Sequence, residues 1–145
     1  MWGGNMDVSL ETLINTVSRY NLYGIEKVKK AYEFAKIKHA GQYRESGEEY
    51  ITHPLAVAII LARLNADIDT ICAGLLHDVI EDTNTTQEDI AAEFSSSVAT
   101  LVMGVTNLTR ASFNSKISSN NANLRKLILG MNKDVRILII KLADR

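Results

Sequence analysis

The stretch GLLHDVIEDT, Gly74 to Thr83, decides how this chain is interpreted, because it places a histidine and three acidic residues directly behind an apolar run. On a helix, residues four apart share a face, so His77 is expected beneath Glu81. In the same way Asp78 is expected beneath Asp82. A buried charge without a partner is costly, so such groups are usually paired or bound to a metal ion.

Two distant residues are candidates to join His77 in a metal site. His53 stands immediately before Pro54 at an expected helix start, and Asp144 follows the apolar run ILIIKLA. Imidazole and carboxylate donors together suit manganese, iron or zinc, whereas calcium and magnesium prefer oxygen alone. The ordinary alternatives are a solvated helix face with a chance HD dipeptide, a capping role for His53 and a solvated Asp144.

Apolar residues recur at helical spacing through almost the whole chain, which predicts an all-α fold of about seven or eight helices. The short runs AIIL and ILII lie within longer segments free of glycine and proline, so we interpret them as helix. Pro54 suits a first helical position, and Thr85 with Glu88 predicts a capping box. Loops are expected at 41–52 and 109–121, because both stretches are rich in polar residues.

Length and composition favour one globular domain and exclude several classes of protein. The chain has 145 residues, of which 46% are hydrophobic and 23% charged, and its net charge of −1 gives no overall attraction to nucleic acid or an anionic membrane. The chain contains no apolar segment of 18 residues, so no membrane-spanning helix is predicted. The single cysteine, Cys72, lies in an apolar run, which indicates a buried structural thiol and fits a reducing cytoplasm.

Three segments together resemble the hydrolase region of the RelA/SpoT homologue family, the enzymes that make and degrade the alarmone (p)ppGpp in the stringent response. They are YRESGEEYITHPLAVAIILARL, AGLLHDVIEDT and KLADR, and they occur in the family's order. The resemblance covers roughly residues 25–145 and implies a helical bundle of the HD-domain type. Residues 1–24 are then expected to be an N-terminal helical extension.

The resemblance implies that His53, His77, Asp78 and Asp144 bind one manganese ion, with iron or zinc as alternatives from the donor chemistry. The implied reaction removes the 3′-pyrophosphate of (p)ppGpp and yields GDP or GTP. Glu81 and Asp82 match the family's catalytic acidic pair, and the sequence does not assign acid and base between them.

The nucleotide is expected at the loop around Arg44, which matches the family's guanine-stacking arginine, and Ser46, which matches a contact to the base edge. The family commonly has lysine where Glu45 stands and proline where Glu49 stands, so substrate affinity is in question. Family members also continue beyond Arg145, which suggests a chain cut short, with synthetase and regulatory domains possible in a longer protein.

Three other polar residues are weaker candidates for the site. We interpret His39 as a core histidine, while Lys141 and Arg110 are candidates for phosphate contacts or for solvated helix faces. Three functions are therefore carried forward: a manganese-dependent (p)ppGpp 3′-pyrophosphohydrolase, an HD phosphohydrolase of another 3′-phosphorylated nucleotide, and a non-catalytic nucleotide-binding regulatory module.

Overall fold

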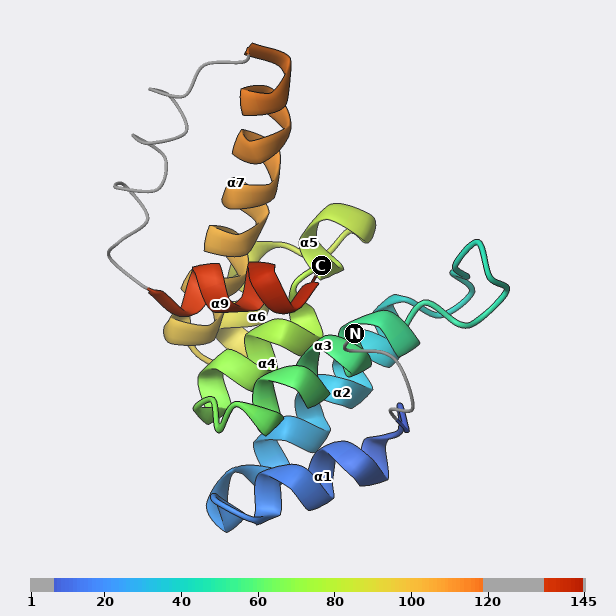
Figure 1. The fold of residues 1–145 in the computed structure, drawn as a ribbon, viewed down its shortest axis with the longest axis vertical. Coiled ribbons are helices and arrows are strands. Elements are labelled where there is room, and N and C mark those ends of the chain that lie inside the picture. Colours follow the sequence, from blue (N-terminus) through green and yellow to red (C-terminus); the bar gives the residue numbers. More distant parts are fainter. Residues whose placement is uncertain (1–6, 119–134, 145) are drawn as a thin grey trace.

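The computed structural model describes residues 7–118 and 135–144, with side chains for 7–110 and 135–144, and confirms the all-α prediction (Figure 1). Among these residues the only β-type pairing is an isolated bridge between Tyr43 and Glu49. The helices are α1 (Leu10–Ser18), the 3-10 helix η1 (Leu22–Gly24), α2 (Ile25–Lys38), α3 (Thr52–Arg63), α4 (Ile68–Leu76), α5 (Val79–Asp82), α6 (Gln87–Glu93), α7 (Ser96–Ser118) and α9 (Val135–Asp144).

Helices α3 and α4 form the centre of the bundle. Helices α1, α2, α7 and α9 pack around them, while α5 and α6 pack against α7. Almost every residue of α3 from Pro54 to Ala62 is buried, and α4 is buried from Thr70 to Leu76. A helix that is apolar all round belongs inside a protein. The runs AIIL and ILII are confirmed as parts of α3 and α9, and Cys72 is fully buried.

The first helix is tied to the same core. Ser9 caps α1 by accepting a hydrogen bond from the amide of Thr12, and Leu13 and Val17 have no exposed surface. The hydroxyl of Tyr20 also donates to the carbonyl oxygen of Ala66 at 2.8 Å, just before α4. The boundary that we expect after residue 24 stays a prediction.

Two predicted helix starts are wrong by a few residues. Helix α3 begins at Thr52, so Pro54 is its third residue and not its first. Proline is still tolerated there, because amides in the first helical turn have no intrahelical partner. The capping box of α6 is formed by Thr86 and Asp89 and not by Thr85 and Glu88. Thr85 is instead buried, with its hydroxyl 2.8 Å from that of Thr83.

The loop predicted at 109–121 is wrong over the residues that the structure describes, because α7 continues to Ser118. The buried side chains of Leu101, Val105 and Leu108 follow one helix face up to this point. Thr109 then donates its hydroxyl to the carbonyl oxygen of Val105 at 3.0 Å, a bond that lets threonine sit within a helix. The remainder of that predicted loop lies outside the described residues.

The loop between α2 and α3, residues 39–51, is confirmed and projects from the bundle (Figure 1). It corresponds to the prediction at 41–52 except for Thr52. In the described part of the chain, no helix is both long and apolar enough to span a membrane.

Candidate metal and nucleotide site

Four helix ends meet at one place near the centre of the fold. His53 lies in the first turn of α3, and His77 directly follows α4. Asp78 precedes α5, and Asp144 is the last residue of α9. The structure therefore brings together all four residues that the resemblance implies as metal ligands, although their role as ligands stays a prediction.

The prediction of one continuous helix through His77 and Asp78 is wrong, because the helix is interrupted between α4 and α5. The Nδ1 atom of His77 lies 2.6 Å from the carbonyl oxygen of Gly74, which in a continuous helix would accept from the amide of Asp78. The imidazole contacts that acceptor, and Asp78 lies in the turn between the two helices with φ −101° and ψ −2°. The break turns both side chains toward α9.

The nitrogen and oxygen atoms of this cluster lie close together. The Nε2 atoms of His53 and His77 are 2.7 Å and 3.1 Å from the same oxygen, Oδ1 of Asp144. One donor atom from each of these three residues lies within 4.8 Å of the others. Asp78 borders the group, with its Oδ2 atom 3.0 Å from Nε2 of His77 and 3.8 Å from Nε2 of His53.

The chemistry of this cluster fits a divalent cation. A carbonyl oxygen can only accept, so the short contact to Gly74 places the proton of a neutral His77 on Nδ1 and leaves the Nε2 lone pair facing the carboxylates. Metal-binding histidines typically donate their other ring N–H to such a group. Two imidazoles and two carboxylates then provide a mixed nitrogen and oxygen donor set.

Electrostatics shows how strongly these groups depend on one another. Burial alone would lower the pKa of His77, but hydrogen bonds to Asp144 and Asp78, together with their charges, raise it to about 10. The carboxyl groups respond in the opposite direction. Burial would raise the pKa of Asp144, but bonds from the two histidines and Lys141 hold it far below its usual value. A positive charge among the carboxylates is therefore strongly favoured.

The acidic pair stands at the end of the short helix α5, at the protein surface. Glu81 pairs with Arg110 of α7, with Oε1 and Nε 3.5 Å apart. Asp82 accepts a hydrogen bond at its backbone carbonyl from the side chain of Gln42 at 3.0 Å. Both residues are exposed, with the carboxylate of Glu81 beside Arg110 and that of Asp82 beside the hydroxyl of Tyr50, which also contacts Asp78.

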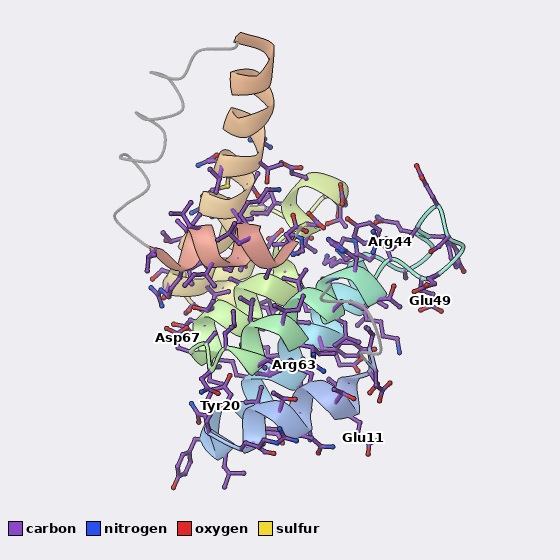
Figure 2. The ribbon with its side chains drawn as sticks, viewed as in Figure 1. Glu11, Tyr20, Arg44, Glu49, Arg63 and Asp67 are labelled. Atoms are coloured by element: carbon purple, nitrogen blue, oxygen red, sulfur yellow. The ribbon has the colours of Figure 1, made fainter. Side chains whose placement is uncertain are left out.

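The predicted nucleotide contacts lie on the projecting loop. Arg44 and Ser46 line one open hollow of about 720 Å³, together with Tyr43, Glu45 and Tyr50. Figure 2 labels Arg44 and Glu49 on this loop. Tyr50 connects the hollow to the cluster, because its hydroxyl donates to Oδ2 of Asp78 at 2.7 Å. Glu45 lines the same hollow as Arg44 and Ser46.

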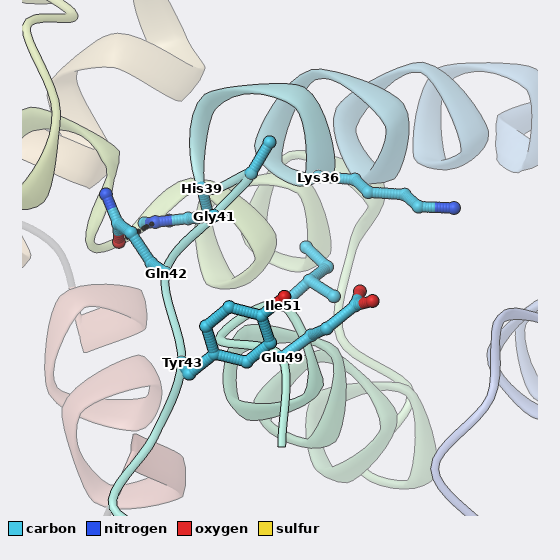
Figure 3. Close-up of a pocket in the computed structure, with 8 residues that line it drawn as sticks. Lys36, His39, Gly41, Gln42, Tyr43, Glu49 and Ile51 are labelled. Carbon is cyan, nitrogen blue, oxygen red and sulfur yellow. Dashed lines mark hydrogen bonds between the residues drawn. The ribbon is translucent and has the colours of Figure 1, made fainter. Parts of the chain in front are cut away.

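Glu49 lies on the other side of the loop. It lines a smaller pocket of about 230 Å³ with Lys36 and His39 (Figure 3). His39 is buried as expected, but only its Nδ1 atom has a partner among the described residues, the Oε1 atom of Gln42 at 3.0 Å. The proline-to-glutamate departure at Glu49 thus lies away from Arg44.

Two residues of the site were not found from the sequence. Tyr50 lies in the loop before α3, and its contact with Asp78 joins residues 28 positions apart, so no local spacing indicated it. Gln42 gave no signal, because its contact with Asp82 depends on how the loop folds back. Of the weaker candidates, Lys141 does reach the cluster, with Nζ 3.1 Å from Oδ2 of Asp144.

The geometry and the sequence agree with one known family. The pattern of the HD domain matches residues 31–145. The chain belongs to the HD-domain family. The histidine and aspartate of the motif, His77 and Asp78, lie between α4 and α5 and face each other at 3.0 Å.

Several longer proteins are similar to this HD domain. The bifunctional (p)ppGpp synthase/hydrolase SpoT of Escherichia coli is 50% identical over 121 residues, which are 83% of this chain and 17% of that protein. The guanosine-3′,5′-bis(diphosphate) 3′-pyrophosphohydrolase of Aquifex aeolicus is 45% identical over 139 residues, 96% of this chain and 20% of that protein.

A third relative carries a different name. The GTP pyrophosphokinase of Myxococcus xanthus is 44% identical over 145 residues, 97% of this chain and 19% of that protein. The chain spans a fifth or less of the length of these three relatives. Their names include both hydrolysis and synthesis.

Proposed function

We propose that this HD domain hydrolyses the 3′-pyrophosphate of (p)ppGpp with the help of one divalent cation, manganese in our assignment. The observation that carries the proposal is the link through Tyr50, which joins the hollow of Arg44 and Ser46 to the His/Asp cluster. A nucleotide base held at the hollow and a phosphate held at the cluster would be two ends of one ligand. The names of the Escherichia coli and Aquifex aeolicus relatives support the same substrate.

In this proposal each part of the chain has a defined task. His53, His77, Asp78 and Asp144 would hold the cation, which supplies charge neutralisation and a more acidic water molecule. Arg44 stacks its planar guanidinium on the guanine base, and Ser46 contacts the base edge.

Glu81 and Asp82 provide the proton transfers in this proposal. Their carboxylates orient a water molecule and take its proton as its oxygen attacks the phosphorus atom attached to the 3′-oxygen. The bond between that phosphorus and the 3′-oxygen breaks, and a proton passes to the 3′-oxygen. The products are GDP or GTP and pyrophosphate, and no oxidant or further reactant is required.

The test is pyrophosphate release from ppGpp by metal-stripped protein, with and without manganese, iron(II) or zinc. We expect turnover that requires added cation and is greatest with manganese, and we expect Asp82→Asn to abolish it. The exposed Asp7→Asn serves as the matched control, because Asp7 lies before α1 and away from the cluster. Equal turnover with zinc would contradict the assignment of manganese while preserving the hydrolase proposal.

The hollow gives one reason to test other nucleotides. Glu45 places a negative charge where a polyanionic ligand is expected. A panel of nucleotides with a 3′-phosphate or 3′-pyrophosphate separates the candidates, and (p)ppGpp is expected to give the highest kcat/KM. Binding of ppGpp without release of pyrophosphate would overturn the hydrolase proposal in favour of a regulatory module.

A further inference from the structure

The loop that carries Arg44 is a closed hairpin. Gln42 and Tyr50 form its base. There the backbone amide of Tyr50 donates to the carbonyl oxygen of Gln42 at 2.9 Å. Nearer its tip, the amide of Arg44 donates to the carbonyl oxygen of Glu48 at 2.8 Å. Gly47 occupies a left-handed conformation with φ 91° that lets the chain reverse. Backbone hydrogen bonds therefore connect the tip of the hairpin to its base.

The two side chains at the base of the hairpin hold opposite ends of α5. Tyr50 donates to the carboxylate of Asp78, the residue that precedes this helix, at 2.7 Å. Gln42 donates to the carbonyl oxygen of Asp82, the last residue of the helix, at 3.0 Å. A helix of four residues is too short to be stable alone, so its position depends on such contacts.

The side chain of Gln42 is itself fixed in orientation. The carbonyl of Asp82 can only accept, so Gln42 must present its NH₂ group there and its Oε1 atom to His39 (Figure 3). Nδ1 of His39, 3.0 Å from that oxygen, must therefore carry the proton. His39 is 2% exposed, and its ring lies 4.8 Å from the ring of Tyr50. One buried imidazole thus supports both side chains that hold α5.

We propose that Gln42 and Tyr50 are positioning residues, which hold both ends of α5 so that a nucleotide bound at the hairpin tip fixes the place of Asp82 relative to the metal cluster. This inference rests on the proposed hydrolase function. Gln42 does not touch the reacting groups, and the hydroxyl of Tyr50 lies beside the carboxylate of Asp82 as well as that of Asp78. Gln42 acts on Asp82 through the backbone, and Tyr50 acts on Asp78 through its carboxylate.

The variant Gln42→Met tests the contact with Asp82. It keeps the length of the side chain but cannot donate a hydrogen bond. We expect kcat to fall about tenfold with KM little changed, because a small misplacement of a catalytic group is costly. We also expect faster amide hydrogen exchange at Asp82 and Thr83, whose amides close α5. Gln87→Met, at an exposed position in the first turn of α6, is the matched control.

The variant Tyr50→Phe tests the contact with Asp78. It keeps the ring against His39 and removes only the hydroxyl. We expect affinity for manganese, measured by chelator competition without substrate, to weaken about tenfold, as for other residues that orient a metal ligand. Tyr23→Phe is the matched control, because Tyr23 is fully exposed in η1.

The outcomes separate the inference from the proposed function. Wild-type amide exchange in Gln42→Met, or wild-type manganese affinity in Tyr50→Phe, would overturn the positioning role whether or not the protein turns over ppGpp. A comparable loss in either control variant would overturn it too. Wild-type protein that releases no pyrophosphate would instead overturn the hydrolase function, while the exchange and metal-binding measurements would still report on α5.

Discussion

At the scale of single residues, Glu45 is a position where an acidic residue stands in place of the lysine common in the family that this chain resembles. The structure places Glu45 in the same hollow as Arg44 and Ser46. The donor types of the metal cluster could be predicted from the sequence, because histidine and aspartate are recognisable wherever they stand. The contact of Tyr50 with Asp78 was not predicted, because it joins residues 28 positions apart and forms only after the hairpin closes.

Replacing Glu45 with glutamine is expected to strengthen nucleotide binding. Removal of one negative charge beside a polyanionic ligand should lower KM for ppGpp a few-fold, with kcat unchanged, and the effect should shrink as ionic strength rises. Steady-state kinetics at two salt concentrations measures this. Glu11→Gln, on the exposed side of α1 (Figure 2), is the control. An unchanged KM at low salt would show that the charge of Glu45 does not repel the bound nucleotide.

At the scale of elements, the sequence indicated the helices well and their interruptions poorly. Periodicity identified α1, α3 and α9, because each buries apolar residues at helical spacing. The break between α4 and α5 was missed, since it depends on a bond from His77 to the carbonyl of Gly74 that no pattern of hydrophobicity reports. The extension of α7 was missed because its polar composition resembles that of a loop.

Close packing of α7 against α9 sets the position of Asp144. A Cβ atom at Gly104 would overlap Cδ1 of Ile137 and lie 2.9 Å from its Cγ1. We expect Gly104→Ala to lower the free energy of unfolding by about 1–2 kcal/mol, because the cost of overpacking exceeds the helix propensity that alanine gains. Manganese affinity should fall as well. Urea unfolding and metal titration measure both.

A double variant checks the cause of that loss. Ile137→Val removes the atom nearest to the new side chain, so adding it to Gly104→Ala should recover part of the stability. Strictly additive losses from the two substitutions would contradict the packing explanation.

The start of α4 is expected to make stability depend on pH. Burial would raise the pKa of Asp67, but hydrogen bonds from Thr70 and the ion pair with Arg136, 3.0 Å away, lower it below the usual 3.8. Wild-type protein should exceed Asp67→Asn in stability by up to about 1 kcal/mol above pH 5. The difference should vanish as pH falls below 3.8 through the lowered pKa. Urea unfolding between pH 3 and pH 7 measures it, and a difference that grows in acid would contradict the assignment.

At the scale of the whole molecule, the cation is expected to stabilise the fold. Its proposed ligands come from α3 and α9 and from the two residues between α4 and α5, so binding favours only the state in which these ends meet. Manganese at 100 times its Kd should add about 2.7 kcal/mol and raise Tm by roughly 5–10 °C. Thermal unfolding of wild-type protein and of His77→Gln, with and without manganese, tests this, and an equal rise in the variant would contradict the site.

The cluster also has a consequence for the order in which the chain acquires its structure. His53 and Asp144, whose side chains are 2.7 Å apart, are separated by 91 positions in the sequence. Contacts of such high sequence separation form late, because the intervening chain must be ordered first. During synthesis the two histidines emerge long before the aspartate, so a growing chain holds only part of a cation site. Capture of the ion with full affinity therefore requires synthesis to have passed Asp144 and α9 to have packed against the start of α3.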